Sequence, residues 1–139
     1  MRGMNVLTPM LALVCWTIVM WFWMYATRLP AMKKAGIDPA KMKEGGELDV
    51  LPRKVRQIAD NYNHLHEQPV LFYAMVVYAH LAGTGDGLMI ALAWIYVGFR
   101  VAHSLWQSLV NFIPVRFGLF TLASLALIGM ALLNVLALV

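Results

Sequence analysis

Residues 6–26 read VLTPMLALVCWTIVMWFWMYA and contain no charged side chain. The hydrocarbon core of a bilayer is about 30 Å thick, and a helix needs about 20 apolar residues to cross it. Aromatic side chains gather in the second half of this run, at Trp16, Trp21, Trp23 and Tyr25. Tryptophan and tyrosine are enriched where a helix meets the membrane surface. The run therefore predicts a membrane-spanning helix at about residues 5–27.

The composition of the whole chain points to the same solvent. The chain has 139 residues, of which 61% are hydrophobic and only 13% are charged. A soluble domain carries about 25% charged residues. We therefore expect a single membrane domain over residues 1–139, and we expect neither a soluble enzyme nor a nucleic-acid-binding protein.

Turn residues divide the rest of the chain into three more helices. Two prolines, Pro52 and Pro114, stand where a helix is expected to begin, and the segment AGTGDG at residues 82–87 is typical of a turn. The predicted helices lie at about residues 5–27, 52–81, 88–112 and 114–138, with a long loop at 28–51. The predicted fold class is all-α, a four-helix transmembrane bundle.

Positive charge is concentrated in one part of the chain. Eight of the eleven Lys and Arg residues fall between Arg28 and Arg56, and the others are Arg2, Arg100 and Arg116. Loops rich in Lys and Arg stay on the cytoplasmic side, where they face anionic lipid headgroups. We therefore expect the long loop and the connection next to Arg116 to be cytoplasmic, and both termini to lie on the opposite side.

The helix expected at 88–112 carries a polar stripe. Its members are Tyr96, Arg100, His103, Gln107 and Asn111, spaced by four, three, four and four residues, so they share one helical face. Arg100 is about twelve residues from either end, which is about 18 Å along the axis. That is farther than an arginine reaches by snorkelling. Arg100 is therefore expected to face the bundle interior or a wet cavity.

A second polar stripe follows the first half of the helix expected at 52–81. Its members are Arg53, Arg56, Asp60, Asn63 or His64, and Glu67, again at steps of three and four. Pro69 follows and predicts a kink, because proline lacks the N–H that would bond to the carbonyl of Leu65. Ionisable groups in a membrane are costly and usually functional. We therefore expect the two stripes to face each other and form a polar pocket near the cytoplasmic side.

Simpler interpretations compete with the pocket. Arginines at the start of a helix commonly anchor it at the interface, and Asp60 then only pairs with Arg56 on a solvated helix end. Arg100 and Glu67 are also compatible with a buried structural ion pair that performs no chemistry. Asn134, in the last helix, is interpreted as a hydrogen bond between helices.

Arg116 is unusual for its position in the first turn of the last helix. The helix dipole disfavours a cation there. We therefore expect another group to hold its guanidinium, either a lipid phosphate or an anionic ligand.

Two segments resemble a known family. Residues 63–72, NHLHEQPVLF, resemble the helix 2 signature of the MAPEG family, the membrane-associated proteins in eicosanoid and glutathione metabolism. Residues 100–104, RVAHS, followed by PVR at 114–116, resemble the region that joins its helices 3 and 4. The chain is similar in length and helix order to bacterial-type members and to the glutathione transferase and prostaglandin E synthase branches.

The resemblance implies a homotrimer in a bacterial inner membrane that binds glutathione as cosubstrate between adjacent subunits. It implies membrane lipids and a hydrophobic small molecule as further partners, and no metal site is predicted. The residues that it implies for holding glutathione are Arg56, Asn63, Glu67, Tyr96, Arg100 and His103. Arg116 is the implied catalytic residue, which stabilises the glutathione thiolate.

The chain departs from the family pattern at three positions. His66 stands where the family has the glutamate of helix 2, with Glu67 one residue later. Gln107 replaces a tyrosine, and Phe112 replaces an arginine. With fewer cations, the site is expected to bind glutathione, a peptide with two carboxylates, more weakly.

Three functions are compatible with these residues. The first is a glutathione-dependent transferase or peroxidase that acts on hydrophobic electrophiles or lipid hydroperoxides. The second is a non-catalytic lipid- or protein-binding protein of the same fold, which the missing cations favour. The third is a proton or ion pathway through His103, Arg100 and Glu67, although no polar stripe continues beyond Pro69.

Overall fold

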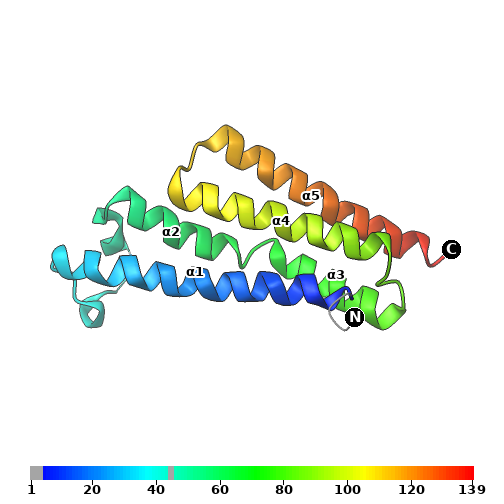
Figure 1. The fold of residues 1–139 in the computed structure, drawn as a ribbon. Coiled ribbons are helices and arrows are strands. Elements are labelled where there is room, and N and C mark those ends of the chain that lie inside the picture. The colour runs from blue at the N-terminus through cyan, green and yellow to red at the C-terminus, as the bar shows by residue number, and fades with distance from the viewer. Residues whose placement is uncertain (1–4, 44–45) are drawn as a thin grey trace.

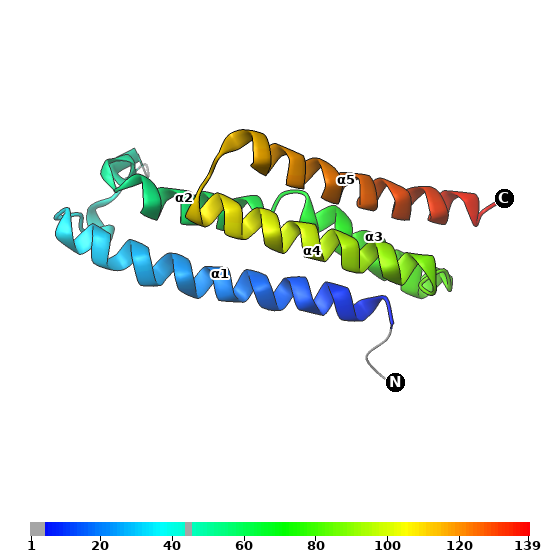
Figure 2. The ribbon, with the colours of Figure 1, turned by 45° about the horizontal axis from the view of Figure 1, so that its top comes forward.

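The computed structural model describes residues 5–43 and 46–139, and within them the secondary structure is entirely helical (Figure 1). The α-helices are α1 (Leu7–Lys34), α2 (Arg53–His64), α3 (Pro69–Ala82), α4 (Leu88–Leu109) and α5 (Ile113–Leu136). Two short 3-10 helices, η1 (Pro39–Lys41) and η2 (Gly46–Val50), lie in the long loop. Because α2 and α3 follow one another along the bundle, the described helices form four rods (Figures 1 and 2).

The first helix is longer than predicted. It continues through Pro30 to Lys34, so the first seven residues of the expected loop 28–51 are helical. Proline removes one backbone donor from a helix. Beyond it Met32 is only 5% exposed, and α1 packs along α2. Tertiary packing therefore outweighs the loss of one hydrogen bond. Arg2, and residues 44–45 of the loop, lie outside the described residues.

The second helix is interrupted, where a single kinked helix was expected. The chain leaves the α-helix after His64 and re-enters it at Pro69, the first residue of α3. Proline is favoured at the first turn of a helix because its missing N–H has no partner there in any case. Residues 65–68 form turns instead, so Pro69 starts a new helix rather than bending an old one.

The end of the bundle that holds both termini is closed by a turn and an interhelical hydrogen bond. Gly83 adopts a left-handed conformation (φ 76°) after α3, and Thr84 N donates to the Ala79 carbonyl oxygen at 2.9 Å. The Thr84 hydroxyl donates to Asn134 Oδ1 at 2.5 Å, and Asn134 Nδ2 lies 3.0 Å from the Met75 sulfur. The predicted helix–helix hydrogen bond of Asn134 is confirmed.

Apolar side chains lie on both the inside and the outside of the bundle. The core contains fully buried residues such as Leu13, Phe72 and Met130, while large apolar residues such as Leu11, Leu71 and Phe117 are exposed. Three helices, α1, α4 and α5, are long and apolar enough to cross a membrane. At 14 residues, α3 is shorter than the roughly 20 residues a span needs, and α2 is polar.

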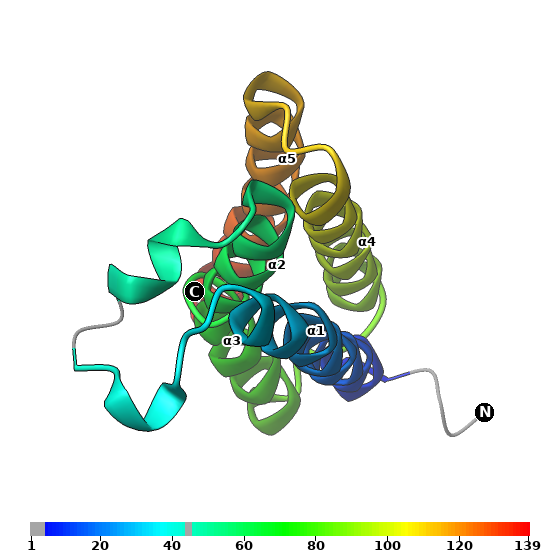
Figure 3. The same cartoon turned by 90° about the vertical axis from the view of Figure 1, so that its left-hand side faces the viewer.

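The connections alternate between the two ends of the bundle. The loop between α1 and α2 lies at the same end as the turn between α4 and α5, while the α3–α4 turn, the start of α1 and the C-terminus lie at the other (Figures 1 and 2). The view along the bundle shows α5 beside α4, and α1 on the far side of α2 from α5 (Figure 3). The fold thus places the long loop and Arg116 at one end, as the charge pattern predicts.

Candidate functional site

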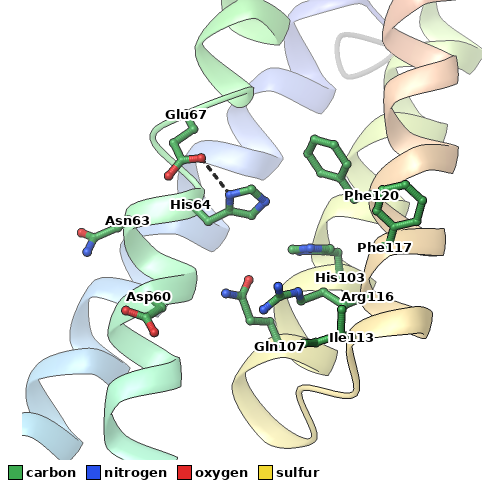
Figure 4. Close-up of a pocket in the computed structure, with 10 residues that line it drawn as sticks. All are labelled: Asp60, Asn63, His64, Glu67, His103, Gln107, Ile113, Arg116, Phe117 and Phe120. Atoms are coloured by element: carbon green, nitrogen blue, oxygen red, sulfur yellow. Dashed lines mark hydrogen bonds and ion pairs between the residues drawn. The ribbon is translucent and has the colours of Figure 1, made fainter. Parts of the chain in front are cut away.

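A polar cleft of about 490 Å³ lies between α2 and the α4–α5 pair. Figure 4 shows side chains from both walls directed into it. Its lining residues are Asp60, Asn63, His64, Glu67, His103, Gln107, Ile113, Arg116, Phe117 and Phe120. Part of each polar stripe thus faces the other across one cavity, with Asp60 and Glu67 on one side and His103 and Gln107 on the other.

The α2 wall of the cleft ends where the helix ends. Asp60 and Asn63 project from the last turns of α2, and Glu67 follows in the turn before Pro69. Because Glu67 lies outside the helix, its side chain extends outwards and is 66% exposed. Its Oε2 atom lies 3.0 Å from His64 Nδ1. The carboxylate and imidazole therefore form a pair at the rim of the cleft.

The electrostatic state of His64 follows from its surroundings. His64 ends α2, outside the three apolar spans, and its side chain is only 25% exposed. Burial, and then the positive charge of Arg100, lower the pKa of His64, while the hydrogen bond to Glu67 opposes that shift. An unperturbed histidine has a pKa of about 6.5. The ring is thus mostly neutral at pH 7.

The α4 wall is formed by His103 and Gln107, with Arg100 one turn deeper. Arg100 is fully buried, as its position in the stripe predicts. Its Nη2 lies 3.5 Å from the His64 carbonyl oxygen, and its guanidinium carbon lies 5.6 Å from the centroid of the Phe120 ring. Its Nε and Nη1 have no partner among the described residues. Arg100 therefore acts on the cleft as a buried positive charge rather than as part of its surface.

The ion pair between Arg100 and Glu67, one of the competing interpretations, is not formed among the described residues. Within the described residues, Glu67 pairs with His64 instead. His64 and Glu67 are three residues apart, a spacing at which side chains also meet on one face of a helix. The Glu67 carboxylate therefore meets the imidazole of its own segment, while Arg100 approaches only the backbone carbonyl of His64.

Arg116 is held by a group that sequence reasoning did not identify. Its Nη1 donates to Asn111 Oδ1 at 2.8 Å, where a lipid phosphate or anionic ligand was expected. Asn111 does not belong to the α4 stripe, because it follows the end of that helix in a left-handed conformation (φ 57°). Asparagine tolerates this conformation better than most residues. The turn thereby directs its amide oxygen towards the start of α5.

Besides the buried Arg100, two more predicted site residues lie outside the cleft lining. Arg56 is at the solvated end of α2, where its Nε donates to the Leu51 carbonyl oxygen at 3.0 Å. Tyr96 is buried in α4 and stacks on Phe72, with ring centroids 4.4 Å apart. Its hydroxyl donates to Gln68 Oε1 at 3.1 Å. Tyr96 therefore stabilises the turn between α2 and α3 from behind.

A buried polar seam between α2 and α4 was not predicted. Gln57 Nε2 donates to the Ser108 carbonyl oxygen at 2.8 Å, and Asn61 Nδ2 donates to the Ser104 hydroxyl. The indole N–H of Trp16 also reaches Ser104, at 2.9 Å. Gln57 and Asn61 are four residues apart, so their spacing is the signal that would have revealed a second polar face of α2.

Comparisons with known proteins identify one match. The model of the MAPEG family matches residues 6–136. No curated protein and no solved structure matches the chain. Together with the three apolar helices, the match establishes an integral membrane protein.

Proposed function

This chain belongs to the MAPEG family, and we propose from that premise that it is a glutathione-dependent membrane transferase or peroxidase. Its substrates would be hydrophobic electrophiles or lipid hydroperoxides. The observation that carries the proposal is the cleft, in which Glu67, His103 and Arg116 converge from three elements. Its volume falls within the range of about 300–1,000 Å³ that small-molecule sites occupy.

The charges of the cleft complement those of glutathione. The tripeptide has an ammonium group, two carboxylates and a thiol, so its site needs both an anion and cations. Glu67 supplies the exposed carboxylate for the ammonium group, and Asn63 lies beside it as a neutral hydrogen-bonding group. Arg116 supplies the cation on the opposite wall, while Arg100 adds positive potential from beneath. Interactions between charges gain strength where water is excluded.

Arg116 is the group that we assign to thiol activation. A free thiol has a pKa of about 8.5, so only a few per cent is thiolate at neutral pH. A guanidinium within hydrogen-bond reach favours the thiolate. Since Asn111 occupies Nη1 of Arg116, other N–H groups of the guanidinium are available to a sulfur atom. The start of α5 adds its own partial positive charge.

A hydrophobic second substrate would enter from the lipid. Ile113, Phe117 and Phe120 form the α5 side of the cleft, and Phe117 is exposed on the outside of the bundle. A molecule dissolved in the membrane therefore reaches the polar cleft along an apolar surface.

A non-catalytic lipid-binding protein of the same fold is the second candidate. The small number of cations in the cleft favours this candidate. Among the described residues that line the cleft, Arg116 is the only arginine or lysine. Arg56 lies outside the lining, and Arg100 is buried. A weakly cationic cleft would suit an anionic headgroup with a single phosphate.

Binding of glutathione separates the two candidates. Thermal unfolding of the detergent-purified protein should shift upwards with glutathione concentration if the cleft is a specific site. Ultraviolet absorbance of the bound thiolate should then disappear in Arg116→Ala and persist in Arg53→Ala, a matched control at the exposed start of α2. Persistent thiolate absorbance in Arg116→Ala would contradict the assignment.

We also propose a homotrimer in a bacterial inner membrane, with the long loop in the cytoplasm. The proposal rests on the family and on the basic end of the bundle, where the loop and Arg116 lie together. Native mass spectrometry should give three chains. Cysteine labelling in the loop should occur only after the inner membrane is made permeable to the reagent.

A further inference from the structure

His64 and Glu67 form a hydrogen-bonded pair, and the carboxylate acceptor determines which ring nitrogen of His64 carries the proton. Glu67 Oε2 lies 3.0 Å from His64 Nδ1. An ionised carboxylate only accepts hydrogen bonds, so Nδ1 must carry the proton that it donates. A neutral imidazole has a single N–H, and Nε2 is therefore the unprotonated nitrogen with a free lone pair. In this arrangement the Glu67 carboxylate holds the His64 ring in the one tautomer that can act as a base at Nε2.

The free nitrogen of this pair lies inside the cleft. Figure 4 shows the His64 ring extending from α2 towards the opposite wall, with Glu67 behind it and Phe120 and His103 beyond. The ring centroids of His64 and His103 are 5.1 Å apart, and those of His64 and Phe120 are 5.5 Å apart. Arg116 lines the same cleft. A thiol placed beside Arg116 thus lies in the cavity that His64 Nε2 faces.

We propose that His64 is the general base that removes the proton from the glutathione thiol, with Glu67 holding its ring in the required tautomer. The inference rests on the proposed function, and it adds to Arg116 a group that accepts the proton. Glu67 Oε1 takes no part in the pair and remains for the ammonium group of the peptide.

The step balances without a further reactant. The S–H bond breaks and its proton moves to His64 Nε2, while the electron pair stays on sulfur next to Arg116. The sulfur forms a bond to the electrophilic carbon, whose leaving group departs with its own electron pair. The imidazolium then returns the proton to the leaving group. Glu67 stabilises the imidazolium by its negative charge.

Charged groups around His64 act in opposite directions. Glu67 favours the imidazolium, while Arg100 and Arg116 on the α4–α5 side disfavour it. Asp60 and His103 line the same cavity. The balance lowers the pKa of His64, chiefly through burial. The ring is therefore neutral before the thiol arrives, and only the neutral ring can accept a proton. The thiolate that forms beside it then favours the imidazolium.

His66 is a matched control for His64. Its Nδ1 lies 2.9 Å from the Tyr62 carbonyl oxygen, so it should be the same tautomer as His64. Its acceptor is a neutral carbonyl group, and its ring lines a different groove, together with Thr17 and Tyr73. His66 thus resembles His64 in chemistry but lies outside the polar cleft.

The first test needs no glutathione. In full-length protein labelled with nitrogen-15 at histidine, ring-nitrogen NMR should show His64 protonated at Nδ1 near neutral pH. The signals are identified by their loss in His64→Gln. Glu67→Gln should lower the pKa of His64 further, because it removes the charge that favours the imidazolium, and should leave His66 unchanged. Protonation of the His64 ring at Nε2 instead would contradict the hydrogen bond from Nδ1 to Glu67 and overturn the proposal.

The second test measures turnover of glutathione with chlorodinitrobenzene. His64→Ala should lower kcat by about 10²–10⁴-fold, the usual contribution of a general base, with glutathione affinity almost unchanged. Added imidazole should restore part of kcat, which also shows that the variant is folded. His66→Ala should keep the wild-type kcat and gain nothing from imidazole.

The two proposals fail in different ways. Wild-type protein that neither binds nor turns over glutathione overturns the proposed function, and with it the thiol as the partner of His64. If the wild type binds and turns over glutathione normally and His64→Ala has the same kcat, the proposed function stands and only the role of His64 as general base fails. A His64→Ala variant with reduced kcat, no rescue by imidazole and an altered Kd for glutathione would assign His64 to binding. That result would also contradict its role as general base.

Discussion

The second rod of the bundle consists of two halves with opposite character. In α2 the buried residues include Gln57 and Asn61, which bond to α4. In α3 the buried residues are Pro69, Phe72, Val76 and Ala79, and the outer surface carries exposed leucines such as Leu71. The same rod thus borders a polar cleft at one end and has an apolar outer surface at the other. The turn 65–68 separates the two halves.

The turn itself is supported from both neighbouring helices. Gln68 accepts a hydrogen bond from Tyr96 in α4 and donates one to the Ser124 hydroxyl in α5, at 2.9 Å. Arg100 approaches the carbonyl oxygen of His64. Buried backbone polar groups need hydrogen-bond partners. The buried polar side chains of α4 therefore have a structural role in addition to shaping the cleft.

The largest effect on stability should come from the apolar half. Phe72→Ala removes a fully buried ring that stacks on Tyr96, and it should reduce the free energy of unfolding by about 3–5 kcal/mol. Leu71→Ala, at an exposed position 61% accessible, should change it by less than about 0.5 kcal/mol. Reversible unfolding in detergent measures both. Equal losses in the two variants would show that α3 does not pack as described.

A stabilising effect is expected from the polar half. Arg100 is buried and has no carboxylate partner among the described residues, and burying a charge is costly. Arg100→Met should therefore raise the free energy of unfolding, by about 1–4 kcal/mol if it behaves like other buried charges replaced by apolar residues. The same variant should bind glutathione more weakly. A less stable variant would mean that Arg100 is needed to hold the turn at His64.

The two buried asparagines provide a direct comparison of the halves. Asn61→Ala should cost about 1–3 kcal/mol, because it leaves the Ser104 hydroxyl with one partner fewer in a buried seam. Asn134→Ala breaks the hydrogen bond to Thr84 at the apolar end and should cost only about 0.6 kcal/mol, the average for such bonds in membranes. Unfolding in detergent again provides the measurement. A larger loss of stability in Asn134→Ala than in Asn61→Ala would show that hydrogen bonds do not stabilise the polar half more than the apolar half.

The smallest effect on stability should come from the α4–α5 turn. Asn111→Gly keeps the left-handed backbone but removes the oxygen that holds Arg116, and it should change the free energy of unfolding by less than about 0.5 kcal/mol. Thiolate absorbance of bound glutathione should nevertheless fall, because the guanidinium is no longer oriented. Undiminished absorbance would indicate that Arg116 needs no support from Asn111.

Regular spacing made the two facing stripes predictable. Steps of three and four residues in α2 and α4 identified Asp60, His103 and Gln107 as neighbours of one cavity, and they line it. The burial of Arg100 followed from its depth in the helix alone. The spacing did not decide whether Glu67 pairs with Arg100 or with His64, because the carboxylate could reach either stripe. The contact of Asn111 with Arg116 also escaped prediction, since the stripe assumed a helix three residues longer than α4.

The sequence by itself determined an all-helical membrane protein with a polar face on two helices, because hydrophobic length and helical periodicity are local properties. Tertiary structure alone decided which polar groups meet. Glu67, in the turn after α2, pairs with His64, and Asn111, in the turn after α4, holds Arg116. Both residues follow a helix end, and helical spacing does not fix the direction of a side chain beyond that end.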